Sequence, residues 1–256
     1  MNNTFNLNRF TLLLKRQWLE FGKIFLITLL VAAGVIVAFY GLTLLPLEEL
    51  NYVPRRLGFR EPLFFIFGFL FISIIASSYF AHLGQKSKAI IDLLIPASTF
   101  EKFLSGIFFT SILSTVSFTL IFGITDWAFV SYIKNYFHQG NLEDLNDVKV
   151  FFIKNDINHF VPVYLSPFIV TSLFMLGSIY FNRFHYIKTA ICLMLFSGIW
   201  TYIVMNTTEV LLSGKTSINA GNNGKDTLEW GLFTILLAIT LIVWFIGYIR
   251  LKEKEV

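Results

Sequence analysis

The chain has 256 residues, of which 55% are hydrophobic and only 14% charged, with a net charge of +4 and a mean hydropathy of +0.68. A soluble domain carries about 25% charged residues, so the composition excludes an ordinary soluble protein and favours an integral membrane protein of one domain. The single cysteine excludes a disulfide scaffold and a zinc site built from cysteines.

The first 23 residues carry a helical stripe of apolar side chains. These side chains recur at intervals of three and four residues, so they share one face of a helix. They are Leu7, Phe10, Leu14, Trp18 and Phe21. Charged residues occupy the opposite face, where Arg16 and Glu20 have the spacing of a helical ion pair. We expect residues 1–23 to form an interfacial helix at the membrane surface, either an elbow that braces a moving bundle or a plain anchor.

Six stretches without charged residues follow. Each is about 20 residues or longer, the length that an α-helix needs to cross roughly 30 Å of hydrocarbon. They are Ile24–Leu47, Pro62–Gln85, Phe103–Thr125, Ile157–Asn182, Thr189–Thr208 and Trp230–Ile249. A β-barrel is excluded because its strands are about 10 residues long and alternate in polarity. The sequence therefore predicts an all-α polytopic membrane protein with a six-span bundle over residues 24–249 and a tail over residues 250–256.

The connections between the spans differ in charge. One alternate set, which includes both chain ends, carries 12 basic and 5 acidic residues, a net charge of +7. The other set carries 8 basic and 11 acidic residues, a net charge of −3. Cytoplasmic connections are enriched in Lys and Arg, so we expect both termini in the cytoplasm. The basic residues then belong to the inner rim of the membrane and not to a nucleic-acid site.

The connection between the second and third spans is the most informative segment. A short helix is expected from Lys86 to Leu94, and Pro96 ends it because the residue before a proline disfavours helical geometry. Ser98 and Glu101 have the spacing of a capping box at the start of the next helix. Five apolar residues should face the cytoplasm, where they need the bilayer surface or a protein partner. They are Ile90, Ile91, Leu93, Leu94 and Ile95.

No catalytic, cofactor or metal site is predicted, because the spans hold almost no ionisable residues and no known catalytic motif. The segment Gly214–Thr216 resembles the end of a phosphate-binding loop, but Glu209 stands where that loop requires a glycine. Cys192 is interpreted as a small apolar residue rather than a nucleophile. An acidic cluster in the third long connection favours a solvated loop over a metal site. Its members are Glu143, Asp144 and Asp147.

Small residues recur at helical spacing within the spans. They predict close helix packing, with a permeation path or a subunit seam as the alternative. The sets are Gly34 with Ala38, then Ser73, Ser77 and Ala81, then Ser111 with Thr115. Five phenylalanines also crowd one half of the second span: Phe64, Phe65, Phe67, Phe69 and Phe71. We expect these rings to face lipid, with the lining of an apolar pathway as the alternative.

The overall plan resembles the permease subunits of export-type ABC transporters. The segment Asp92–Leu104 looks like the Leu-Pro-x-Ser segment of that family and is most similar to permeases of Bacteroidetes-type bacteria. Ile95 replaces the usual leucine before Pro96. The resemblance implies a bacterial inner-membrane location and a coupling helix within Lys86–Ile95 that docks on a separate cytoplasmic ATPase.

The resemblance also implies a second permease chain, identical or related, and it leaves ATP binding to the partner subunit. The residues expected to couple this chain to the ATPase are Lys86, Lys88, Asp92, Leu94, Pro96, Ser98, Glu101 and Lys102. Their expected role is mechanical, so the chain is not expected to be an enzyme. Besides membrane lipid and these two chains, no partner is implied, and nucleic acid is not one. The alternative hypothesis is a non-transporting membrane scaffold, sensor or assembly factor.

Overall fold

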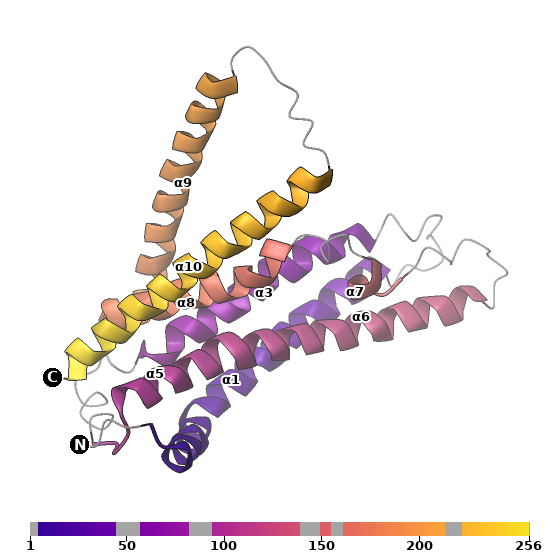
Figure 1. Cartoon of the computed structure of the whole chain (residues 1–256). Helices are drawn as coiled ribbons and strands as arrows, with labels where there is room; N and C mark the ends of the chain where they lie inside the picture. The colour runs from indigo at the N-terminus through magenta and orange to yellow at the C-terminus, as the bar shows by residue number, and fades with distance from the viewer. Residues whose placement is uncertain are drawn as a thin grey trace.

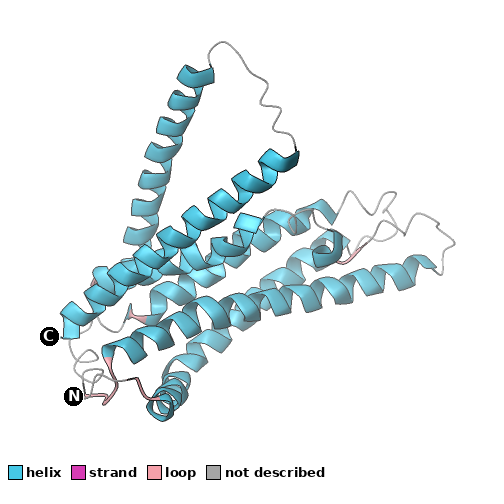
Figure 2. Ribbon diagram, in the orientation of Figure 1, coloured by secondary structure: helices cyan, strands magenta, loops and turns pink. Residues whose placement is uncertain are grey.

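A computed structural model of the protein describes residues 5–44, 57–81, 94–138, 149–154, 161–212 and 222–255. The elements in chain order are α1 (Leu7–Leu44), η2 (Leu57–Phe59), α3 (Arg60–Tyr79), α5 (Thr99–Ile107), η4 (Phe108–Leu113), α6 (Ser114–His138), α7 (Phe151–Lys154), η7 (Val161–Leu165), α8 (Ser166–Tyr180), α9 (His185–Leu212) and α10 (Asn222–Glu255). The element η4 is a π-helix, and η2 and η7 are 3₁₀-helices. The described ranges contain no strand, so the all-α prediction is confirmed (Figure 2).

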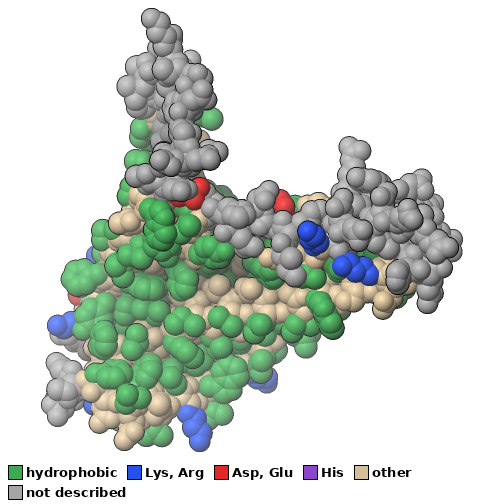
Figure 3. Space-filling view, turned by 45° about the vertical axis from the view of Figure 1, so that its right-hand side comes forward, with side chains coloured by type: hydrophobic (Ala, Val, Ile, Leu, Met, Phe, Trp, Pro, Cys, Tyr) green, Lys and Arg blue, Asp and Glu red, His purple; other side chains and the backbone are tan. Residues whose placement is uncertain are grey.

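Six helical segments in the described part of the chain are long and apolar enough to cross a membrane. They are Leu7–Leu42, Leu57–Tyr79, Thr99–Asn135, Val161–Tyr180, His185–Ile203 and Glu229–Lys254. Each overlaps one charge-free stretch of the sequence. Hydrophobic side chains cover much of the face drawn in Figure 3, and Lys and Arg lie near its edges. By helix length and hydropathy, the chain is a multi-pass membrane protein.

Four helical rods run alongside one another in the bundle: α1, α3, α8 and the continuous run α5–η4–α6 (Figure 1). The helix α8 packs against α3, α9 and α10, whereas α9 stands away from the bundle along most of its length. Both chain ends lie at one end of the bundle (Figure 1). We call this the Glu101 end and the opposite one the Asp126 end, after the buried carboxylate found at each.

The predicted interfacial segment and the first span form one continuous helix, α1. Its first turns, indigo in Figure 1, bend away from the direction of the remainder. The ring of Trp18 stacks on Phe109 at a centroid distance of 6.3 Å, and Phe21 meets Tyr79 edge-on at 5.3 Å. The inner part of the apolar stripe therefore packs on the bundle, whereas Leu7 is exposed. A membrane-surface position for this segment stays a prediction.

Three helices extend beyond the boundaries that the charge-free stretches indicated. We expected a connection from Asp126 onward, but α6 continues to His138 and Asp126 is buried. We expected another over Glu209–Glu229, but α9 runs to Leu212 and α10 begins at Asn222. A charge-free stretch identifies only the apolar part of a helix. The backbone hydrogen bonds of the helix can continue into charged residues on either side, so the helices are longer than the stretches. The acidic cluster Glu143, Asp144 and Asp147 and the segment Gly214–Thr216 lie outside the described residues.

A buried ion pair joins four elements at the Asp126 end. The Asp126 side chain is 0% exposed, and its Oδ1 accepts hydrogen bonds from the Tyr40 hydroxyl at 2.7 Å and from Arg60 Nη1 at 3.0 Å. Its Oδ2 accepts from the Phe151 backbone N–H at 2.7 Å. Arg60 also donates to the Lys149 carbonyl at 3.1 Å. Burying a charge is costly unless it is paired and hydrogen-bonded, and here each carboxylate oxygen has a donor.

Two of the small hydroxyl residues that were predicted to pack between helices do contact a neighbouring helix. The Ser77 hydroxyl lies 2.8 Å from His185 Nδ1, and the Ser111 hydroxyl lies 2.8 Å from that of Thr171. These contacts confirm the predicted packing role for Ser77 and Ser111. Gly34 differs, because a Cβ built there meets no atom within 4 Å. Its small size therefore serves no close helix contact among the residues that the structure describes.

Replacing Asp126 by alanine should lower stability strongly, because it leaves the Arg60 guanidinium buried without its counter-charge. Breaking a buried pair in this way costs about 3–5 kcal/mol. The control is Glu20→Ala at the exposed Arg16–Glu20 pair, whose predicted contact is confirmed at 3.0 Å. An exposed pair contributes about 0–1 kcal/mol, so the apparent melting temperature of the purified protein should fall much further for Asp126→Ala. Equal shifts for the two variants contradict the assigned role of the pair.

Replacing Gly177 by alanine should force α8 and α9 apart where they meet. A Cβ built at Gly177 lies 1.9 Å from Thr189 Oγ1, a distance at which two atoms cannot both remain in place. Overpacking of this kind costs about 1–3 kcal/mol. The matched control is Gly198→Ala on α9, where a Cβ meets nothing within 4 Å. Thermal denaturation should show a lower melting temperature for Gly177→Ala and an unchanged one for Gly198→Ala. A larger decrease for Gly198→Ala is incompatible with this packing.

Candidate functional site at the start of α5

The segment that precedes α5 ends in the predicted capping box. Ser98 is the N-cap residue, with φ −70° and ψ 151°, and its hydroxyl accepts a hydrogen bond from the Glu101 N–H at 3.2 Å. Glu101 Oε2 in turn accepts from the Ser98 N–H at 3.0 Å. The two bonds satisfy donors that the first turn of a helix otherwise leaves open. The sequence prediction for these two residues is confirmed in both contacts.

Glu101 has a second set of partners, which the sequence analysis missed. Its Oε1 accepts from Arg9 Nη2 at 2.7 Å and from the Asn6 N–H at 3.0 Å. Its Oε2 accepts from Arg9 Nε at 2.7 Å. Asn6 itself caps α1, since its Oδ1 accepts from the Asn8 N–H at 3.0 Å. One side chain, 0% exposed, therefore joins the start of α5 to the start of α1 through a bidentate arginine pair.

This set of contacts around Glu101, Ser98, Arg9 and Asn6 is called the Glu101 junction below. Its charges are arranged favourably, because a carboxylate in the first turn of a helix faces the positive end of the helix dipole. Deeper in the bundle, the Tyr79 hydroxyl donates to Gln17 Oε1 and lies 3.3 Å from the Ser105 hydroxyl. These bonds connect α3 to the same two helices, so α1, α3 and α5 are joined at one end.

The remaining predicted coupling residues are distributed between surface and interior. Leu94 is 78% exposed and Pro96 is also exposed. Lys102 is buried and faces the bundle, as Glu101 does. Lys86, Lys88 and Asp92, with most of the expected coupling helix, lie outside the described residues. The described surface on this segment is therefore apolar and is formed by Leu94, Pro96 and the half-exposed Phe100.

Ile95 corrects one prediction. The sequence analysis placed it with the apolar residues that face the cytoplasm, but the structure buries it in a small cluster with Leu13 and Ala97. The backbone turns there, with the Ala97 N–H bonded to the Ile95 carbonyl at 2.8 Å. That turn directs Ile95 toward α1 and leaves Leu94 on the outside. Ile95 thus adds an apolar contact beside the ionic one at the Glu101 junction.

The polar groups of the Glu101 junction are bonded to one another. Within the described ranges, no three His, Cys, Asp or Glu side chains gather closely enough to hold a metal ion. Each carboxylate oxygen of Glu101 is already occupied by N–H donors. The contacts hold two helix starts in a fixed relation, which is a mechanical property.

Comparison with known proteins found no protein-family model, no curated protein and no solved structure that matches the chain.

Replacing Glu101 by alanine should release the start of α1 from the bundle. The change removes one carboxylate partner from each of Arg9, Asn6 and Ser98, so amide hydrogen exchange should accelerate in residues 6–13 and at the start of α5. Ser98→Ala removes one cap bond, at a cost of about 1 kcal/mol, and should affect only the start of α5. The control is Glu253→Ala, which breaks an exposed pair with Arg250. Unchanged protection of residues 6–13 in Glu101→Ala is the result that contradicts the junction.

Proposed function

We propose that the chain is a membrane-spanning permease subunit of an ATP-driven exporter in a bacterial inner membrane. One observation carries the proposal: the segment that sequence resemblance assigns to ATPase coupling leads directly into the Glu101 junction. ATP binds and is hydrolysed on a separate cytoplasmic subunit, and a second permease chain completes the transporter. The role of this chain is to convert a push at one end of the bundle into a movement of its helices.

The path of that movement follows the described contacts. A displacement of residues 86–95 reaches α5 through the turn at Pro96, and the capping box fixes where the helix begins. The Arg9–Glu101 pair, 2.7 Å long, carries the displacement to α1 as well. The run α5–η4–α6 is continuous from Thr99 to His138, so it transmits motion as one rod. The π-helix η4 supplies a place where such a rod can adjust, since π-turns often occur at functional sites.

The proposal requires the Glu101 end to face the cytoplasm. The charge distribution supports this orientation, because the connections with a net charge of +7 include both chain ends. The two chain ends lie at the Glu101 end of the bundle (Figure 1). Leu94 and Pro96 are exposed at that same end, where a cytoplasmic partner has access to them.

A non-transporting scaffold is the second candidate, and the exposure of α9 is compatible with it as well as with the permease. This helix presents large apolar side chains over much of its length: Met194, Leu195, Phe196, Ile199, Trp200 and Tyr202. Such a surface suits lipid, a second permease chain or a client membrane protein. The presence of an ATPase partner separates the two candidates, since a scaffold needs none.

Affinity purification of the tagged chain from its native membrane should recover a cytoplasmic ATP-binding subunit. Leu94→Asp should abolish that recovery, because it places a charge at the most exposed apolar position in the described part of the coupling segment. The matched control is Phe184→Asp, which is 73% exposed at the same end of the bundle. Its backbone has φ 54°, a conformation that aspartate tolerates. Recovery of the intact chain without an ATPase contradicts the exporter and favours the scaffold.

A further inference from the structure

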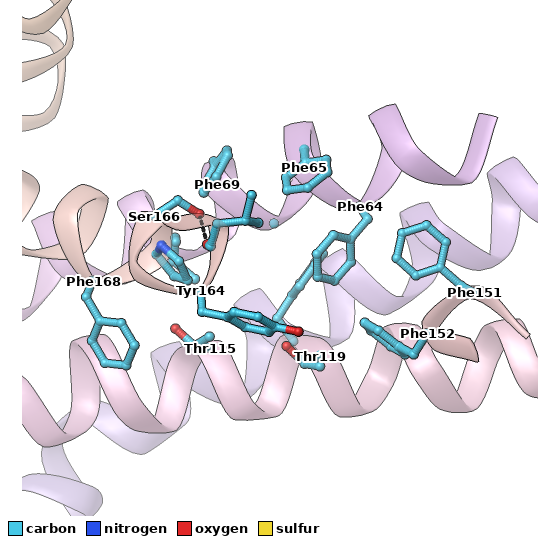
Figure 4. Close-up of a pocket in the computed structure, with 15 residues that line it drawn as sticks. Phe64, Phe65, Phe69, Thr115, Thr119, Phe151, Phe152, Tyr164, Ser166 and Phe168 are labelled. Atoms are coloured by element: carbon cyan, nitrogen blue, oxygen red, sulfur yellow. Dashed lines mark hydrogen bonds between the residues drawn. The ribbon is translucent and has the colours of Figure 1, made fainter. Parts of the chain in front are cut away.

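An aromatic cavity and a basic surface in the described part of the bundle differ in what they can recognise. The cavity, of about 390 Å³, is bounded by α3, α6, α7 and the η7–α8 segment, and its wall is largely aromatic (Figure 4). For Phe64, Phe65 and Phe69, lining this cavity replaces the expected lipid-facing position. No described charged side chain lines it, so nothing in its wall distinguishes lipid from another apolar occupant. The basic surface, at the Glu101 end, does carry such a distinction.

Three consecutive residues between α8 and α9, Tyr180–Asn182, hold cations from two different helices. Arg250 Cζ lies over the tyrosine ring, 5.4 Å from its centroid. Lys188 Nζ lies over the phenylalanine ring at 5.6 Å. Lys254 Nζ donates a hydrogen bond to the asparagine Oδ1 at 3.1 Å. The turn therefore gathers one cation from α9 and two from the last turns of α10, and these three side chains are called the cation cluster below.

The cation cluster is exposed and largely without counter-charge. All three of its side chains are exposed. Arg250 forms an ion pair with Glu253 at 2.7 Å, whereas no described carboxylate pairs with Lys188 or Lys254. The two aromatic rings under Arg250 and Lys188 lie only 5.2 Å apart. Cations held this close repel one another, and an anion placed among them removes that repulsion.

Lys188 also occupies a position that helix electrostatics disfavours. It is the fourth residue of α9, whose first turn has no acidic residue. The N-terminal end of a helix carries a partial positive charge, so a cation there is unfavourable without a compensating anion. Arg183, two residues before α9, adds a second exposed cation at this end. The orientation of the chain requires positive charge on this side of the membrane, but it does not require these positions.

Exposed apolar side chains continue from the cation cluster along α9. Ile191 and Leu195 follow Lys188 at three and seven positions, so the three residues share one face of the helix. The two apolar residues are 51% and 63% exposed. The helix α9 stands away from the bundle along most of its length, which leaves this face open to the bilayer (Figure 1). An amphiphile with an anionic head and apolar chains therefore matches both parts of the surface, whereas a soluble anion matches only one.

We propose that Lys188, Arg250 and Lys254 bind the headgroup of an anionic phospholipid whose acyl chains lie along the exposed face of α9. Basic side chains at the edge of a membrane span attract anionic headgroups. The contacts with Tyr180–Asn182 restrict the three long side chains before binding, so less conformational entropy is lost when the lipid binds. The site depends on the location of the chain in a membrane and not on an ATPase, so it stands independently of the exporter proposal.

Native mass spectrometry of the purified full chain in detergent measures this binding. The probes are dioleoyl phosphatidylglycerol, which is anionic, and dioleoyl phosphatidylcholine, which has the same acyl chains and no net charge. Phosphatidylglycerol should occupy half of the chains at a concentration at least about fivefold lower than phosphatidylcholine, the factor that one Lys or Arg contributes to binding an anionic lipid surface. Glycerophosphoglycerol, which is the anionic headgroup without acyl chains, should not bind in that range.

Three variants complete the test. Lys188→Gln and Lys254→Gln should each raise the concentration of phosphatidylglycerol required by about fivefold and leave phosphatidylcholine binding unchanged. The matched control is Lys252→Gln, which removes the same charge from an exposed position on another face of α10, because residues two apart on a helix do not face each other. It should keep the wild-type affinity. The proposal is overturned by equal affinity for the two lipids, by an equal loss in all three variants, or by binding of glycerophosphoglycerol at the concentration of the lipid.

Discussion

Two buried carboxylates, each held by an arginine, determine how the first helix lies against the rest of the bundle. Glu101 binds Arg9 at the start of α1, and Asp126 binds Arg60 and the Tyr40 hydroxyl near the end of α1. Both carboxylates are 0% exposed, so separating either pair leaves a charge in an environment that cannot solvate it. The helix α1 is thereby fixed at both ends to the run α5–η4–α6. The aromatic side chains between these two ends then pack with α1 held in one position along α5–η4–α6.

The bundle has a tightly packed side and an open side. Large side chains such as Phe25, Phe71 and Phe122 are almost fully buried on the α1, α3 and α6 side. The helices α9 and α10 bury few of their side chains, and α9 departs from the others (Figure 1). A permease needs both properties: a stiff unit that carries motion from the ATPase, and an apolar flank that faces lipid or a second subunit. The tightly packed side contains the Glu101 junction.

Local features of the sequence predicted local features of the structure. The six spans follow from hydropathy. The capping box follows from the three-residue spacing of Ser98 and Glu101, which is typical of the start of a helix. Contacts between distant residues escaped prediction. Nothing near Arg9 indicates that it pairs with a carboxylate 92 residues away. Asp126 looked like the first residue of a connection because it is the charge that ends a charge-free stretch, and its partners on α1, α3 and α7 are distant in sequence. Ile95 looked exposed because the turn that buries it, from Ile95 to Ala97, has no sequence signature beyond Pro96.

Thr115 illustrates the same limit in a different way. Its sequence context is a small-residue pattern that predicts packing, and Ser111 on the same face does pack against Thr171. Only the three-dimensional arrangement distinguishes the two: Ser111 finds a hydroxyl partner, whereas the buried Thr115 hydroxyl has none among the described residues. The π-helix between α5 and α6 carries no sequence signature that the periodicity of apolar residues reveals.

The most direct test of the central claim is an electron cryo-microscopy reconstruction of the chain purified with its native partners in lipid nanodiscs. The account predicts density for a cytoplasmic ATP-binding subunit against Leu94, Pro96 and Phe100, at the end where Glu101 binds Arg9. Density for such a subunit at the Asp126 end, or a particle in which only membrane chains accompany this one, contradicts it.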